Sequence, residues 1–172
     1  LRLRTHESPI LSATLSSDDQ HLISFDGRLV VVTQIDNPDS KVTYPAQSPF
    51  TTGRSASLAE HKSRIEFVDH VVYRDGSRLV WQTWPETPRT TVITDSADDI
   101  LGLTFQPGVD RIAVLRRAEK QTRLEYRSPE RLLQQAKLDL SHDARMDWID
   151  DEALLIHDQR SAAVFFPGSD LQ

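Results

Sequence analysis

The fold is decided by residues 10–32, whose sequence is ILSATLSSDDQHLISFDGRLVVV. Three runs rich in apolar and β-branched residues, 10–15, 21–25 and 29–32, alternate here with two clusters of turn-forming residues. β-Branched side chains fit a pleated surface, and Asp26-Gly27 is a strong hairpin signal because glycine takes positive φ without steric cost. The stretch therefore predicts three consecutive antiparallel strands joined by short turns.

The same order of strand, turn, strand, turn and strand recurs along the chain. It returns at 98–140 and 142–172 and, more loosely, at 61–94, where the first strand is expected at 64–67. One apolar or aromatic residue is expected at the equivalent position of each copy: Leu15, Phe67, Phe105 and Trp148. These residues are 52, 38 and 43 positions apart. The spacings bracket the roughly 40–45 residues of a four-stranded propeller blade.

Short segments of strand character between the copies predict outer fourth strands, at 41–44, 90–93 and 137–140. Residues 1–5 have the same character, and a ring could close by pairing the two chain ends, which would remove exposed edges. We therefore predict one all-β domain over residues 1–172, a small or partial β-propeller of about four antiparallel blades. Its repeats are expected at 6–44, 61–94, 98–140 and 142–172. The alternative is a two-sheet β-sandwich whose strands imitate blades.

One segment also carries a helix signal. Ser128 could cap a helix of two or three turns with Pro129 in its first position, running to Lys137. The alternative for this region is an outer strand at 134–140.

The chain resembles a β-propeller of the WD40 and TolB-like repeat type. His6 lies ten residues before Ser16-Ser17-Asp18-Asp19, and Leu22 follows, which matches the spacing of the family's His, Ser-Pro-Asp-Gly and Leu, with Pro and Gly replaced. The resemblance implies a blade-stapling network of His6, Ser24 and Asp26. The family's Trp is missing from the following strand, and Trp-Asp never ends a repeat. The resemblance further implies a non-catalytic scaffold or sensor domain that displays loops to protein partners, as part of a larger protein or complex.

Composition excludes several classes of function. The 172 residues contain no cysteine, which excludes disulfide scaffolds, zinc ribbons and thiol nucleophiles. A net charge of −6 argues against nucleic-acid binding. No apolar run is long enough for a transmembrane helix, so a soluble protein is expected. The absent cysteine favours a bacterial, periplasmic setting slightly over the cytoplasm, and no cofactor is predicted.

A protein-binding surface is predicted in the second copy, where residue types that anchor interfaces gather. These residues are Tyr73, Arg74, Trp81, Trp84 and Arg89. Trp84 stands in a Pro-flanked segment that is typical of a surface loop. The alternative is that Trp81 fills the core between blades and Trp84 covers a sheet edge.

Histidines beside acids precede three of the predicted inner strands, at His6, His61 and His142. If they converge on one rim, they could bind a divalent cation or serve a hydrolase, which is the alternative function. The competing interpretation is that each histidine caps its own blade. Residues 53–57 are expected to be a Ser/Thr-rich loop, and the basic run from Arg116 to Arg123 a solvated hairpin.

Overall fold

The structure is a computed structural model of the chain that describes residues 6–16, 19–58, 65–84, 90–119 and 121–168. The side chains of 48–49, 54–58, 65–68 and 84 fall outside this description. All fifteen regular elements in these ranges are β-strands, which form four antiparallel sheets. No helix in the described residues is long and apolar enough to cross a membrane.

Each sheet is built from one continuous stretch of chain and is called a blade here, numbered in chain order. Blade 1 consists of β1 (Ser12–Leu15), β2 (His21–Phe25), β3 (Leu29–Gln34) and β4 (Lys41–Pro45). Blade 2 consists of β5 (Gln47–Leu58), β6 (Ile65–Asp75), β7 (Arg78–Trp84) and β8 (Thr90–Thr94).

Blade 3 consists of β9 (Ile100–Phe105), β10 (Ile112–Ala118), β11 (Gln121–Arg127) and β12 (Leu132–Leu138). Blade 4 consists of β13 (Arg145–Trp148), β14 (Leu154–His157) and β15 (Ala162–Phe165). After the last strand of each complete blade, the chain passes to the first strand of the next blade.

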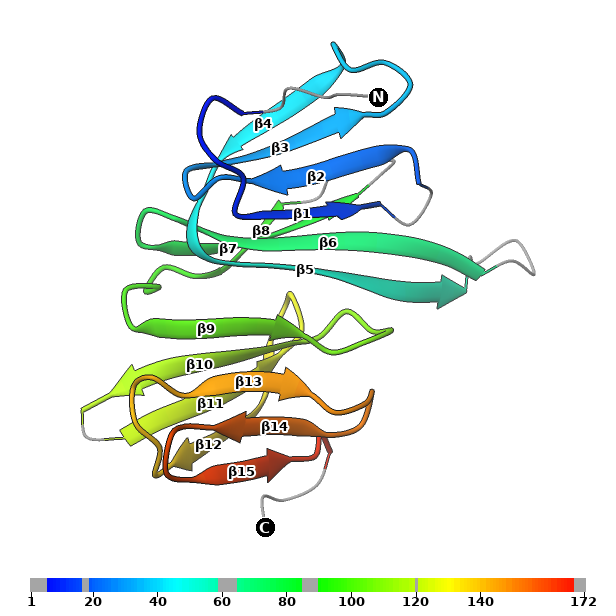
Figure 1. Ribbon diagram of the computed structural model, residues 1–172. Helices are drawn as coiled ribbons and strands as arrows, with labels where there is room; N and C mark the ends of the chain where they lie inside the picture. The colour runs from blue at the N-terminus through cyan, green and yellow to red at the C-terminus, as the bar shows by residue number, and fades with distance from the viewer. Residues whose placement is uncertain (1–5, 17–18, 59–64, 85–89, 120, 169–172) are drawn as a thin grey trace.

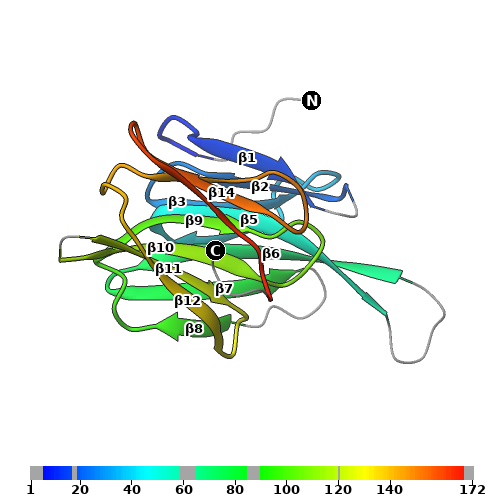
Figure 2. The same cartoon turned by 90° about the horizontal axis from the view of Figure 1, so that it is seen from below.

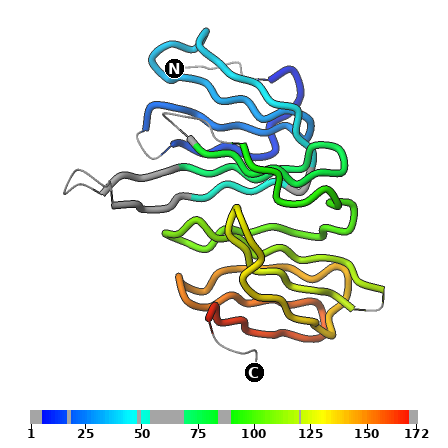
Figure 3. Tube along the Cα trace, turned by 180° about the vertical axis from the view of Figure 1, so that it is seen from behind, coloured from blue at the N-terminus to red at the C-terminus, as the bar shows by residue number. Residues whose placement is uncertain are grey.

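The four blades stack in an open arc, with blade 1 at one end and blade 4 at the other (Figure 1). The view from behind shows the same order, with blade 1 in blue and blade 4 in orange and red at opposite ends of the stack (Figure 3). Viewed from below, the hairpin of β5 and β6 projects beyond the other strands (Figure 2). The all-β prediction of a partial propeller of about four blades is therefore confirmed.

Three apolar cores lie between successive blades. Strand alternation sends neighbouring residues into different cores: Val71 and Tyr73 face blade 1, whereas Val72 faces blade 3. In the same way, Ile112 faces blade 2 and Ala113 faces blade 4. Inner strands of this kind are buried on both faces, which explains their nearly continuous apolar sequences. Three cores between four sheets also exclude the two-sheet sandwich.

The second copy differs from its prediction. Its first strand is β5 at Gln47–Leu58, and residues 65–75 form one continuous strand, β6, instead of a first strand at 64–67 and a second at 71–73. The prediction of a loop at 53–57 is wrong for the same reason. β5 contains few apolar residues because it lines the inside of the arc, so its sequence has the composition of a loop.

The helix signal at 128–137 is also overturned, because this segment contains β12. The Oγ of Ser128 accepts a hydrogen bond from the backbone N–H of Arg131 at 3.2 Å. The Ser-Pro pair therefore forms a turn before a strand. Ala136 and Leu138 alternate into the core of blades 3 and 4, which is the two-residue period of a strand.

Candidate interaction site

His6 ties the segment before β1 to the body of blade 1. Its Nε2 lies 2.9 Å from Ser24 Oγ, and its Nδ1 lies 3.1 Å from Asp26 Oδ2. The side chains of His6 and Asp26 are 0% and 5% exposed. The structure thus brings together the three residues that the resemblance implies for the blade-stapling network.

Asp26 is held as a carboxylate by its surroundings. Burial alone would raise its pKa, but hydrogen bonds from the backbone N–H groups of Arg28 and Leu29, together with nearby His6, lower the pKa below its usual value. The same two backbone bonds fix the turn between β2 and β3, where Gly27 takes φ 93°. The Asp26 carboxylate therefore stabilises both the turn between β2 and β3 and the segment before β1 that contains His6.

Blade 4 reproduces this arrangement with a serine in place of the histidine. Ser141, which precedes β13, donates its backbone N–H and its hydroxyl to Asp158 Oδ2, at 2.8 and 2.9 Å. Asp158 lies in the turn before β15 and accepts the backbone N–H groups of Arg160 and Ser161 on Oδ1. These hydrogen bonds lower the pKa of Asp158 far below its usual range. His142, beside Ser141, is exposed.

Between blades 2 and 3 the rim is fastened by arginines. Arg74 of β6 pairs with Asp98, which precedes β9. Arg116, whose side chain is 4% exposed, pairs with Asp99 and lies 3.1 Å from Glu125. The predicted solvated hairpin thus contains a buried arginine, because two carboxylates compensate its charge.

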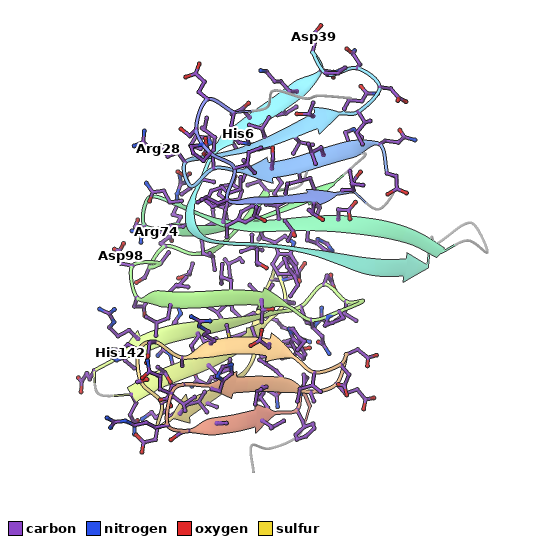
Figure 4. All side chains as sticks on the ribbon, viewed as in Figure 1. His6, Arg28, Asp39, Arg74, Asp98 and His142 are labelled. Carbon is purple, nitrogen blue, oxygen red and sulfur yellow. The ribbon has the colours of Figure 1, made fainter. Side chains whose placement is uncertain are left out.

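The labelled residues His6, Arg74, Asp98 and His142 lie along one rim of the stack (Figure 4). His6 belongs to blade 1 and His142 to blade 4, at opposite ends of the arc (Figure 4). His61, the third predicted ligand, lies outside the described residues. Within the described part of the chain, no group of three or more His, Asp or Glu side chains could hold a metal ion. A three-histidine site therefore stays a prediction.

The predicted binding residues of blade 2 separate into two groups. Tyr73 and Trp81 are buried, at 6% and 1% exposure, in the cores on the two sides of blade 2. Arg74 lies at the surface with Asp98. The Trp84 side chain and all of Arg89 fall outside the description, so their part in binding remains a prediction. The aromatic cluster expected on one surface is therefore not formed by Tyr73 and Trp81, whose rings pack in separate cores.

Sequence reasoning missed Asp69 and His70, which are buried in the middle of β6 at 4% and 3% exposure. Trp81 Nε1 donates to His70 Nδ1 at 3.1 Å. Burial lowers the pKa of His70, and the nearby carboxylates of Asp110 and Asp69 oppose this only in part. The sequence places this Asp-His pair between apolar residues on both sides, which would be the signal for a buried pair. The same pattern is typical of a turn between two strands, so it did not predict burial.

An open groove runs between blades 1 and 2. Two hollows of about 330 Å³ and 370 Å³ lie along it and share Thr52 of β5. The first is lined by apolar Leu11, Phe25 and Phe50, of which the two phenylalanine rings stack with centroids 4.5 Å apart. The second is lined by residues of β1, β5 and β6, including His70, and by the turn that follows β9. Both hollows combine polar and apolar lining residues, with Ser12 and Thr51 in the first and Leu15 and Ile23 in the second.

No family model and no curated protein matches the chain. Among solved structures, Hsv2 from Kluyveromyces marxianus is similar with a TM-score of 0.65 and 14% identity, covering 97% of this chain and 50% of that chain. The WD40 domain of SCAP from fission yeast is similar with a TM-score of 0.51 and 9% identity, covering 90% of this chain and 39% of that chain. The chain has a WD40-like β-propeller fold.

The chain spans about half the length of Hsv2, in keeping with an arc of four blades. The WD40 part of the sequence resemblance is therefore confirmed at the level of the fold. Nothing in the comparisons bears on the TolB-like part, which stays a prediction.

Proposed function

We propose that this WD40-like chain is a non-catalytic scaffold that binds a protein partner, and that the groove between blades 1 and 2 receives an extended segment of that partner. The observation that carries the proposal is the groove itself, with Leu11 and Phe50 among the residues that line its first hollow. Leu11 is 67% exposed, so an apolar side chain of a partner would gain buried area there.

The strands beside the groove also suit an extended peptide. In the described residues, β1 pairs only with β2 and β5 pairs only with β6, so each strand turns one backbone edge toward the inside of the arc. Free backbone N–H and C=O groups at such edges can hydrogen-bond a peptide main chain, while the hollows take its side chains.

The hydrolase alternative has no support in the described residues. His6 and Asp26 staple blade 1, Asp158 fixes a turn, and Asp98 and Asp99 pair with arginines. These acids and the histidine have structural partners on the rim, and the groove draws on different residues. A non-catalytic scaffold accounts for the structural role of these charged residues and for a groove that is lined by other residues.

The proposal is tested by peptide-display selection against the immobilised chain, followed by titration of each selected peptide. Thr52→Arg places a long charged side chain at the residue shared by both hollows. Thr43→Arg, on the exposed outer strand β4, is the matched control. We expect peptides to bind wild type and Thr43→Arg equally and to bind Thr52→Arg at least about ten-fold more weakly. If no peptide is selected, or if the peptides bind Thr52→Arg and Thr43→Arg equally, the proposal that the groove binds a peptide is wrong.

The predicted loop contact is tested in the same titration. Trp84→Ala weakens binding if the segment predicted as a surface loop after β7 extends the contact surface, and Arg89→Ala acts in the same direction. Binding unchanged by both substitutions removes this loop from the proposed surface and leaves the groove as the contact.

A further inference from the structure

The first strand of blade 1, β1, has an open edge beside the groove. In blade 3 the first strand, β9, lies against β5, where Phe105 approaches Gly53 so closely that a Cβ at Gly53 would meet its atoms at 2.2–2.6 Å. Between β1 and β5, by contrast, lie the two hollows. In the described part of the chain β1 pairs only with β2, and three of its four residues are exposed.

The hydrogen bonds to β2 show which backbone groups of β1 face this open edge. The N–H of Ser16, the residue after β1, donates to the carbonyl of His21 at 2.9 Å, in register with the rest of the ladder. In an antiparallel pair, every second residue exchanges its N–H and C=O with the neighbouring strand, and the residues between them point both groups the other way. Residues 12, 14 and 16 therefore bond to β2, whereas Ala13 and Leu15 direct their backbone groups to the open edge.

These outward groups can accept a further strand. The carbonyl of Leu15 receives a long hydrogen bond of 3.4 Å from Oγ1 of Thr14, and a carbonyl oxygen has a second lone pair. No other strand in the described residues lies in the ladder on this side of β1. Two N–H donors and two carbonyl acceptors on alternate residues form the pattern that an added β-strand completes.

Side-chain alternation connects this edge with the two hollows. Phe25 and Ile23, the register partners of Ser12 and Thr14, pack in the core shared with blade 2. Ser12 and Thr14 lie on that same face of the sheet, and they line the first and the second hollow respectively. Directly opposite residues of a sheet share a face. A strand added beside β1 would thus present one side chain to each hollow, from the residues opposite Ser12 and Thr14.

We propose that β1 is the strand to which the partner peptide adds, an inference that rests on the groove function proposed above. The middle residue of the bound segment exchanges both of its backbone hydrogen bonds with Ala13. The residues on its two sides, at positions i and i+2, place their side chains in the two hollows. The side chain at i+1 lies with that of Ala13 on the opposite face of blade 1. Affinity therefore depends on the side chains at i and i+2 and on the main chain at i+1.

Amide hydrogen exchange, followed by NMR residue by residue, tests the pairing. In the free chain we expect the amide of Thr14 to be protected by its bond to β2 and the amides of Ala13 and Leu15 to exchange quickly. A peptide from the display selection described above, added to saturation, should slow exchange at Ala13 and Leu15 by about ten-fold or more. Unchanged exchange at both residues in the saturated complex overturns the inference.

A proline substitution tests the same contact by affinity. Ala13→Pro removes one outward N–H and keeps the bonds to β2, because edge strands accept proline where the N–H faces away from the sheet. Ala13→Val retains the N–H and is the matched control. We expect the selected peptide to bind Ala13→Pro about five- to ten-fold more weakly than Ala13→Val. Urea unfolding verifies that both variants are folded, and equal affinities for two folded variants would rule out pairing at Ala13.

Methylation of the peptide's backbone nitrogens, one at a time, tests the pairing with the wild-type chain and so does not depend on the folding of Ala13→Pro. Only every second N–H of an added strand faces β1. Affinity should therefore fall about five- to ten-fold at alternate nitrogens. Equal losses at adjacent nitrogens, or no loss at any nitrogen, contradict strand addition.

The tests separate this inference from the proposed function. If peptides bind and Thr52→Arg weakens them, while the exchange, proline and methylation experiments all fail, the groove binds through side chains alone. The proposed function then stands and strand addition to β1 is wrong. If no peptide binds the wild-type chain, the proposed function fails and this inference fails with it.

Discussion

Trp81 of β7 donates its indole N–H to Nδ1 of His70 on β6, with 3.1 Å between the two nitrogens. Because Nδ1 accepts, the imidazole is neutral and carries its proton on Nε2. Phe105 of blade 3 packs against both rings, with centroids 5.7 Å from His70 and 4.9 Å from Trp81. A hydrogen bond within blade 2 is thus covered by a ring from blade 3.

This contact makes stability depend on pH. Burial lowers the pKa of His70 in the folded chain below its usual value of about 6.5. The unfolded chain therefore binds more protons once the pH falls below about 6.5, and the free energy of unfolding decreases as the pH is lowered from there. The stability is present above that pH and is lost towards the lower pKa of the folded state. Urea unfolding at a series of pH values measures this slope.

His70→Gln should flatten the slope, because the amide oxygen can accept from Trp81 but does not titrate. His142→Gln, at an exposed position on blade 4, is the control and should keep the wild-type slope. A slope unaffected by His70→Gln would assign the pH dependence to other groups.

Gly53 of β5 is required by the close approach of Phe105. A Cβ at position 53 would meet ring and Cβ atoms of Phe105 at 2.2–2.6 Å. We expect Gly53→Ala to lower the free energy of unfolding by about 1–3 kcal/mol, measured by urea denaturation. Gly102→Ala is the control on β9, where the nearest atom, Cε of Met146, is 3.5 Å away. It should change stability by less than about 0.5 kcal/mol, and an equal loss in both variants would disprove the steric argument.

Arg116 and Arg117 are neighbours on β10 with opposite surroundings. Arg116 lies between Asp99 and Glu125 and donates to the carbonyl of Ser96 at 2.7 Å, whereas Arg117 is exposed. Arg116→Met leaves Glu125 paired with Arg123 and Arg127 alone and should cost about 1–3 kcal/mol in thermal or urea unfolding. Arg117→Met should cost less than about 0.5 kcal/mol. If Arg116→Met and Arg117→Met lower the free energy of unfolding by similar amounts, the ion pairs of Arg116 with Asp99 and Glu125 contribute little to stability.

His6 and Asp26 should be energetically coupled. In a double-mutant cycle of His6→Ala and Asp26→Asn, we expect a coupling energy of about 0.5–3 kcal/mol, because each substitution removes the partner of the other. The measurement is urea unfolding of the four chains. Additive effects would mean that His6 contributes through packing and its bond to Ser24, with no contribution from Asp26.

The sequence predicts blades 1 and 4 closely because their strands alternate regularly and their turns carry Asp or Gly, whereas in blade 3 it allows a helix where β12 lies at Leu132–Leu138. The strand β2 at His21–Phe25 has the predicted bounds, and β4 at Lys41–Pro45 is one residue longer than predicted. β5 was not predictable in this way. Its residues are small and polar, and the reason for Gly53 is a ring 52 positions later in the chain.

The candidate site was less predictable than the fold. The staple of His6, Ser24 and Asp26 has a characteristic spacing, so it could be recognised within one copy. The burial of His70 depends on Trp81 and on Phe105 of another blade, and no local pattern encodes that proximity. The groove likewise arises from the relative positions of blades 1 and 2, so the sequence of β1 or β5 alone does not predict it.

The order in which strands pair has a consequence for synthesis. Among the strands that the structure describes, every hydrogen-bonded pair joins consecutive strands, so the four described strands of blade 1 have their partners once Pro45 has left the ribosome. Its core, however, is completed by Val71 and Tyr73 of blade 2. Folding of the nascent chain therefore advances one blade behind translation. At each stage the growing end carries one uncovered apolar face, which the following blade covers when it emerges.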